Sequence, residues 1–184
     1  MKIKQIVQLC RKSGKMIILR GNDDVQWLGD GESMYPLYDA PLYDESSLYA
    51  AYDINESQRS KILFKHADIE KMKICFADED ATETQTDKSD ISIEYADRKL
   101  AAFHTQEGIL FLDKKYLAPL KDMEGAEVFL RYTNDNMPYF AVKLGFMICG
   151  VIMPVNIIDE KFTEQLHSLY RQCELSLLNQ REKK

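Results

Sequence analysis

The sequence predicts an α+β fold, in which antiparallel sheets carry an amphipathic helix near each end of the chain. Three observations predict it. Apolar residues recur with helical spacing at residues 3–10, strand-like segments separated by turn residues fill residues 91–155, and a second helical repeat covers residues 159–177. The chain has 184 residues, of which 45% are hydrophobic and 29% charged. This is the composition of a soluble globular protein long enough to fold without a disulfide or a metal.

The N-terminal segment predicts a basic amphipathic helix. Ile3, Ile6, Val7 and Cys10 follow the helical spacing, and Gly14 is a suitable stop. The first twenty residues contain no acid, and their cations are Lys2, Lys4, Arg11, Lys12, Lys15 and Arg20. Two interpretations remain open: an ordinary solvated face, or a surface that faces phosphates.

The charge of the whole chain is distributed unevenly. The formal net charge is −6, which by itself disfavours a nucleic-acid partner. Residues 78–94, however, carry seven acids and one lysine, whereas the N-terminal segment is purely basic. This asymmetry says more about partners than the total does.

The next elements are two strands and a short helix. "MIILR" and "VQWLG" are rich in strand-forming residues, "GNDD" between them predicts a turn, and "GDG" at residues 29–31 predicts another. A metal or phosphate role for this GDG is the weaker alternative. Residues 35–52 predict a loop followed by a helix that begins in the Asp44–Ser47 region, and "QRSKILFKH" either continues that helix or begins a strand.

An acidic connector, "ADEDATETQTDKSD" at residues 77–90, separates the two halves of the chain. It is polar and nearly free of apolar groups, which predicts a mobile surface segment. Its carboxylates could hold a divalent cation, but the segment lacks the glycine and distal glutamate of a calcium-binding loop.

Residues 91–155 predict mainly strands. "ISIEY" and "GILFLD" are the first two, and "KKYLAPLKDM" is a short helix with Asp113 as its N-cap. "AEVFLRYT", "PYFAVKLG" and "FMICGVIMPV" then predict a three-stranded antiparallel meander with turns at residues 134–136 and Gly145. Pro154 belongs at a strand end, because proline cannot donate to a ladder.

The last segment predicts an amphipathic helix with Asp159 as its N-cap. Its apolar stripe consists of Phe162, Leu166, Leu169, Cys173 and Leu177. We expect the helix to pack back onto its own sheet, and a partner interface is the alternative. The expected organisation is therefore a domain at residues 1–155, with the 77–90 connector between its halves, and a helix at residues 156–184 packed on the same domain.

No catalytic constellation is visible. His66, His104 and His167 are isolated, and the phosphate-binding and nucleophile motifs are absent. We therefore expect no enzyme activity, no cofactor and no metal. The four cysteines, far apart and each in an apolar context, predict buried free thiols in a reducing cytoplasm. The longest apolar run has twelve residues and no secretory signal is visible, so no membrane association is expected.

Three segments carry a resemblance to a known family. "FLDKKYLAPLKDMEGAEVFLRYT" at residues 111–133 and "VIMPVNI" at residues 151–157 resemble the C-terminal part of the bacterial DNA polymerase III beta sliding clamp, which ends in V-V-M-P-M-R-L. "VQWLGDGESMYPL" at residues 25–37 is more loosely similar to the clamp segment built around T-D-G-H-R.

The resemblance implies a DNA-clamp-like domain, in which two helices lie on one face of antiparallel sheets and face DNA. In this sequence they are residues 2–14 and 114–123. The DNA-binding positions that it implies are Lys2, Lys4, Arg11, Lys12, Lys15, Lys114, Lys115 and Lys121. It also implies a hydrophobic pocket that captures peptides of replication or repair proteins, formed by Val151, Met153, Pro154 and Val155.

The sequence departs from the clamp pattern in several places. There is room for one domain in place of three, Pro119 interrupts the second helix, and a further helix follows the Met-Pro strand. Single-domain relatives of this kind point to a phage or mobile element. The expected function is a non-catalytic accessory protein of DNA replication, a processivity-type factor that binds duplex DNA nonspecifically and forms homo-oligomers. The alternative is a protein-interaction module that keeps the clamp fold without encircling DNA.

Overall fold

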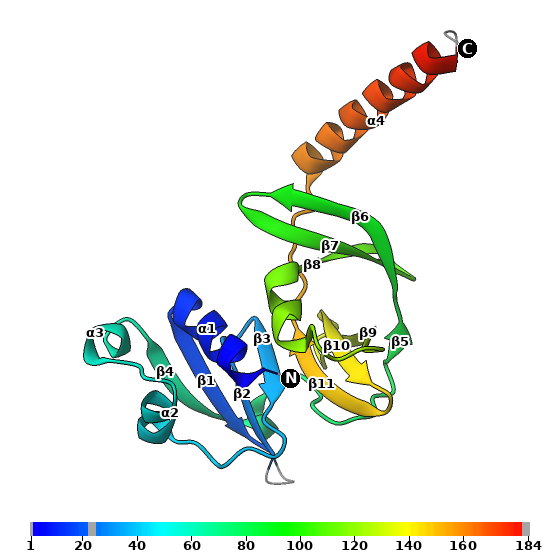
Figure 1. Ribbon diagram of the computed structural model, residues 1–184. Coiled ribbons are helices and arrows are strands. Elements are labelled where there is room, and N and C mark those ends of the chain that lie inside the picture. The colour runs from blue at the N-terminus through cyan, green and yellow to red at the C-terminus, as the bar shows by residue number, and fades with distance from the viewer. Residues whose placement is uncertain (1, 22–24, 182–184) are drawn as a thin grey trace.

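A computed structural model describes residues 2–21 and 25–181 and has the predicted mixed α+β architecture (Figure 1). An eight-stranded sheet forms the body, a three-stranded sheet lies beside it, and a long helix leaves the small sheet. The turn predicted at "GNDD" falls mostly on residues 22–24, which lie outside the described residues.

The first half of the chain builds one side of the large sheet. Its elements are α1 (Ile3–Ser13), β1 (Lys15–Arg20), β2 (Gln26–Gly29), β3 (Ser33–Pro36), α2 (Glu45–Ala51), α3 (Glu56–Arg59), β4 (Leu63–Asp68) and the 3₁₀-helix η1 (Ile69–Lys71). As predicted, α1 ends at Gly14, whose φ of 71° suits a glycine, and Asp44 caps α2. "QRSKILFKH" divides between α3 and β4. Strand β4 pairs parallel to β1, so the sheet is not purely antiparallel as expected.

The second half contributes the small sheet and the other side of the large sheet. Its elements are β5 (Thr84–Gln85), β6 (Asp87–Tyr95), β7 (Arg98–Thr105), β8 (Gly108–Asp113), the 3₁₀-helix η2 (Lys114–Leu120), β9 (Glu127–Tyr132), β10 (Pro138–Leu144), β11 (Met147–Ile152) and α4 (Glu160–Arg181). The predicted meander is confirmed as β9–β10–β11. Strand β7 is missing from the sequence prediction, because its alanines Ala101 and Ala102 have low strand propensity.

The large sheet repeats one arrangement twice. Its strand order is β4-β1-β2-β3-β11-β10-β9-β5. Each half contributes a helical segment followed by three antiparallel strands, α1-β1-β2-β3 and η2-β9-β10-β11, and the last strands of the two halves pair with each other. The two helical segments therefore occupy equivalent places.

The two faces of the large sheet are covered differently. On one face, Ile6, Val7 and Cys10 of α1 pack into the main core together with Tyr116 and Leu120 of η2. On the other face, a second core is covered by the segment that follows β4, through Ile69, Met72, Ile74 and Phe76. Both predicted helical segments thus lie on one face. The second one is a 3₁₀-helix that spans 114–120 in place of 114–123, with Pro119 inside it.

The helix α4 departs from the prediction that it packs on its own domain. Asp159 caps it as predicted, accepting a 2.7 Å hydrogen bond from the N–H of Phe162. Phe162 is the one buried residue described in α4. The sequence pattern correctly predicted an amphipathic helix, but a pattern does not specify which surface covers the stripe.

The Met-Pro segment lies where the chain passes from one sheet to the other. β11 ends at Ile152, and the N–H of Met153 donates to the carbonyl of Glu32 at 2.8 Å. Val155 then forms a single bridge with Phe111 of the small sheet. Pro154 sits between these two contacts, where no donor is required, which confirms its predicted place at a strand end.

The cysteine prediction is half right. Cys10 and Cys149 are buried, and burial raises the pKa of both thiols. Cys75 is half-buried and Cys173 is exposed on α4, so the expectation of four buried thiols is wrong for these two. None of the helices in the described ranges is long and apolar enough to span a bilayer.

Candidate nucleic-acid interface

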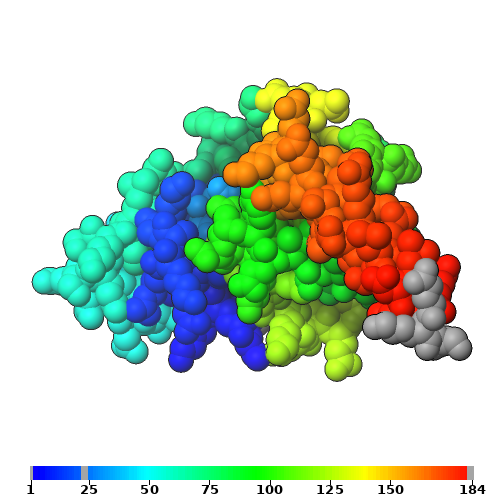
Figure 2. Space-filling view, turned by 90° about the horizontal axis from the view of Figure 1, so that it is seen from above, coloured from blue at the N-terminus to red at the C-terminus, as the bar shows by residue number. Residues whose placement is uncertain are grey.

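The helices α1 and η2 lie side by side on the main-core face of the large sheet. The N–H of Lys2 donates to the carbonyl of Pro119 at 3.1 Å, which joins the start of α1 to the end of η2. Figure 1 shows the blue helix α1 next to the green helical turn of η2, and Figure 2 shows the blue N-terminal segment between the cyan and green segments. Two segments more than a hundred residues apart in the sequence therefore form one surface.

A buried hydrogen-bond cluster holds η2 in this place. The side chain of Asp30, 2% exposed, comes from the turn between β2 and β3. It accepts a 3.2 Å hydrogen bond from the Tyr116 hydroxyl, while the Tyr35 hydroxyl donates to the Tyr116 carbonyl at 2.6 Å. Asp113 also caps η2 as predicted, accepting from the N–H of Lys115 at 3.1 Å. Burial raises the pKa of both phenols, so they stay neutral donors.

Removing the Tyr116 hydroxyl will loosen η2. We expect Tyr116→Phe to lower the free energy of unfolding by about 1–3 kcal/mol, because one oxygen of the buried Asp30 loses its donor. Urea denaturation measures the change. Ser46→Ala, which removes an exposed hydroxyl from α2, is the control and should leave the free energy unchanged within about 0.5 kcal/mol.

The α1 cations share one solvent-facing stripe. Lys4, Gln8, Arg11 and Lys12 are exposed, with the spacing of one side of a helix. The side chains of Lys4, Arg11 and Lys12 form no ion pair with any described residue. Because the opposite side of α1 is buried in the core, these three charges point away from the sheet.

The η2 cations extend the same surface, with partial neutralisation. Lys115 forms a 3.2 Å ion pair with Asp113 and lies 4.6 Å from the centroid of the Tyr116 ring. Lys2 pairs with Asp122 at 2.6 Å across the α1–η2 junction. Lys114 and Lys121 form no ion pair within the described ranges. Both ion pairs are largely exposed on the lysine side, so the lysines remain available to phosphates at a small energetic cost.

Lys15 does not belong to this surface. Lys15, Ile17 and Leu19 are alternate residues of β1, so their side chains lie on the same face of the sheet. That face is opposite to the one on which Met16 and Ile18 pack. Because strand side chains alternate between faces, the predicted convergence of Lys15 with the α1 cations is wrong. The basic face is defined from here on as Lys2, Lys4, Arg11, Lys12, Lys114, Lys115 and Lys121.

A cleft beside α1 adds one cation that the sequence reasoning missed. It has a volume of about 500 Å³ and is lined by Gln8, Arg11, Lys12, Gln58, Lys61 and Ile62. Lys61 follows α3 and is exposed. The sequence did not show that Lys61 lies in this cleft, because its position depends on the parallel pairing of β4 with β1. The cleft gathers three cations and two amide side chains without an acid, which suits an anionic ligand.

The predicted peptide pocket is not formed as expected. Val151 is buried in the second core, and Met153 packs against that same core. Val155 packs instead against the third core, with Phe111 and Phe162. The four predicted residues, Pro154 included, therefore lie along a segment that passes from the large sheet to the small sheet. Met72, Ile74 and Phe76 cover the core that holds Val151.

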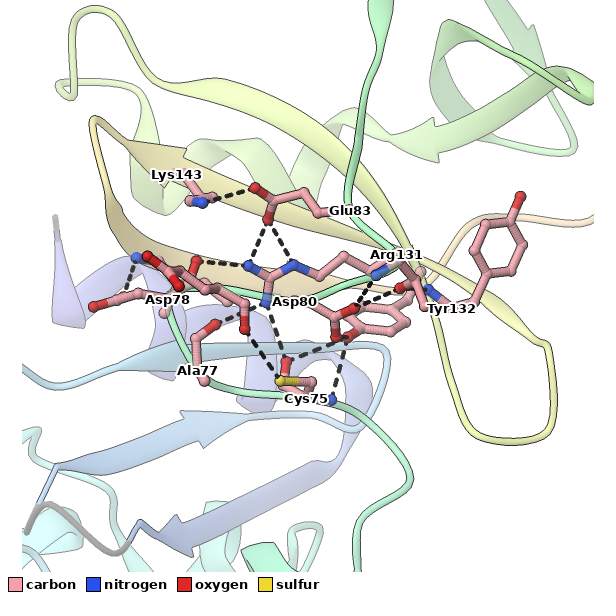
Figure 3. A network of polar contacts seen from close by, with 12 residues as sticks. Cys75, Ala77, Asp78, Asp80, Glu83, Arg131, Tyr132 and Lys143 are labelled. Atoms are coloured by element: carbon pink, nitrogen blue, oxygen red, sulfur yellow. Dashed lines mark hydrogen bonds and ion pairs between the residues drawn. The ribbon is translucent and has the colours of Figure 1, made fainter.

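The acidic connector is a strap held by a buried arginine, which corrects the prediction of a mobile segment (Figure 3). Arg131, 0% exposed, contacts Glu83 at 2.5 Å and donates to the carbonyls of Ala77 and Asp78, each at 2.8 Å. Lys143 pairs with the other oxygen of Glu83 at 2.8 Å. Asp78 and Asp80 also accept hydrogen bonds from the N–H groups of Ile148 and Thr82, so three of the connector carboxylates are committed to structure. No group of three or more potential metal ligands occurs among the described residues.

The strap also depends on Tyr139, which makes stability sensitive to alkali. The Tyr139 hydroxyl accepts from the N–H of Cys75 at 3.2 Å, and burial raises its pKa to about 12. Because the folded pKa exceeds the unfolded value of about 10, stability is complete below pH 10 and falls as the pH rises towards 12. We expect the wild type to lose roughly 2 kcal/mol more than Tyr139→Phe over this range, measured by denaturation at several pH values.

No protein-family model matches the chain, and neither the curated proteins nor the solved structures contain a significant match. The fold, the basic face and the cleft beside α1 are therefore the observations on which a function is assigned.

Proposed function

We propose that the protein is a non-catalytic, clamp-like accessory protein that binds duplex DNA nonspecifically through the basic face. The observation that carries this proposal is the α1–η2 junction. There, Lys2 and Pro119 join two helical segments whose exposed sides are cationic, in a protein whose net charge is −6. Concentrating the cations on one surface allows an acidic protein to bind phosphates.

The chemistry of the face favours backbone phosphates over bases. α1 contains no aromatic residue, and Tyr116, the one aromatic residue of η2, is buried. Stacking on single-stranded bases is therefore not available from these two helices. Lysine and arginine side chains on an exposed helix pair neutralise phosphates without reading sequence.

The clamp-like part of the proposal rests on the arrangement and on the sequence resemblance together. A clamp domain places two helices on one face of its sheets, facing DNA; α1 and η2 likewise lie together on one face of the large sheet, which supports the proposal. The repeated helix-then-three-strands pattern fits the same idea. One chain supplies one such domain, so encircling DNA would require several copies.

Fluorescence anisotropy with a labelled duplex tests the binding. Five cations of the basic face form no ion pair with a described residue, so we expect the logarithm of the affinity to fall with the logarithm of salt with a slope of about −4 to −5. Two unrelated duplex sequences should bind equally. Absence of binding at low salt, or a strong preference for one sequence, would reject the proposal.

A protein-interaction module is the second candidate, and one observation favours it. α4 exposes a row of leucines over the length of the helix, and such surfaces mark protein contacts. In this case light scattering would find a complex with a protein partner, and duplex DNA would not compete for it.

A further inference from the structure

The helix α4 is anchored at one end only. Phe162 packs edge-on against the rings of Tyr95 and Phe111, with centroid distances of 5.5 Å and 5.8 Å. Every later residue of α4 is exposed. Figure 1 shows the helix projecting from the small sheet, and Figure 2 places its red end at the edge of the molecule.

This exposed helix carries a continuous apolar stripe. Its members lie on one side of the helix and are Leu166, Leu169, Tyr170, Cys173 and Leu177, defined here as the α4 stripe. Leu169 and Tyr170 are 61% and 60% exposed, and Leu177 is 54% exposed. Most of the stability of a protein helix comes from packing of its amphipathic face, and exposed apolar surfaces of this kind mark contact sites, so the stripe needs a cover.

We propose that the cover is α4 of a second copy of this chain, packed antiparallel across a two-fold axis. If the axis passes between Arg171 and Gln172, Leu166 of one copy lies opposite Leu177 of the other, and Tyr170 lies opposite Cys173. Four of the five stripe residues thus lie opposite one another, as a symmetric two-fold interface requires, and Leu169 lies opposite Glu174. The pairing buries the stripe on both copies and leaves the basic face of each free.

The charges of α4 select the antiparallel orientation. The start of α4 carries three acids and one cation, Asp159, Glu160, Glu164 and Lys161, whereas the second half carries two cations and one acid, Arg171, Arg181 and Glu174. Antiparallel packing brings the acidic start of one helix to the basic end of the other and opposes the two helix dipoles. Parallel packing would place like charges and like dipole ends together.

Light scattering of the full chain with two matched variants tests the interface. Leu175 and Leu177 are 52% and 54% exposed but lie about 200° apart around the helix. We expect wild type to have the mass of two chains. Leu177→Glu should weaken the dimer at least about 100-fold, because the change occurs twice in a symmetric interface. Leu175→Glu should leave it intact. A monomeric wild type, or equal effects of the two variants, would overturn the proposal.

Disulfide trapping tests the orientation. In the antiparallel register, Tyr170→Cys places a thiol opposite Cys173 of the other copy, so mild oxidation should give a covalent dimer. The same variant carrying Cys173→Ser should not cross-link, nor should the wild type, because the two Cys173 residues are offset along the helices. Cross-linking of wild type through Cys173 would contradict the antiparallel arrangement. These outcomes do not depend on DNA, so they are separable from the proposed function.

Discussion

Replacing Arg131 by methionine is expected to lower the free energy of unfolding by about 3–5 kcal/mol, the typical cost of breaking a buried ion pair from one side. Arg131 is 0% exposed and is the common partner of Glu83 and of backbone carbonyls of the strap. Without it one carboxylate oxygen of Glu83 and the strap carbonyls lose their donors while they remain enclosed, and Lys143 contacts only the other oxygen of Glu83. Urea denaturation followed by circular dichroism measures the loss.

An exposed ion pair provides the control for this change. Lys73 pairs with Asp135, but its side chain is 66% exposed. We expect Lys73→Met to cost less than about 1 kcal/mol, because water screens exposed pairs. Equal effects of the two substitutions would show that the strap is not anchored by Arg131.

The second large effect concerns duplex DNA. We expect Arg11→Glu combined with Lys12→Glu to weaken duplex binding about 50-fold to 100-fold at roughly 0.1 M salt, since each lost phosphate contact removes about 0.9 from the salt slope. The slope itself should become shallower by about 2. Anisotropy over a salt series measures both quantities.

The matched control reverses two cations on the opposite face. Lys65 pairs in register with Ile17 in the parallel β1–β4 ladder, which places it beside Lys15. Lys15→Glu combined with Lys65→Glu changes the net charge by the same amount as the test variant. It should reduce affinity only slightly and leave the slope unchanged. An equal loss in both variants would mean that overall charge, and not the basic face, governs binding.

Local signals in the sequence were sufficient for most elements. The apolar spacing of α1, the caps Asp44, Asp113 and Asp159, and the turns of the β9–β11 meander each depend on neighbours within a few residues. These are the signals that single-sequence reasoning detects well, because they require no knowledge of tertiary contacts.

The misassigned features depend on contacts between distant segments. "MIILR" is apolar on both faces, so it gives no alternation to show on which side Lys15 lies. Arg131 lies in an ordinary strand pattern, and its partner Glu83 is 48 residues away. The apolar stripe of α4 was visible in the sequence, but its exposure was not, because whether a helix packs on its own domain depends on distant contacts.

The contact surface itself can be mapped by acetylating lysines in the presence and absence of duplex DNA, with mass spectrometry of the products. If the basic face binds DNA, the duplex should protect Lys4, Lys12 and Lys121 and leave Lys15 and Lys65 as reactive as in the free protein. Protection of Lys15 and Lys65 instead, or identical labelling with and without DNA under conditions where the duplex is bound, would contradict the account.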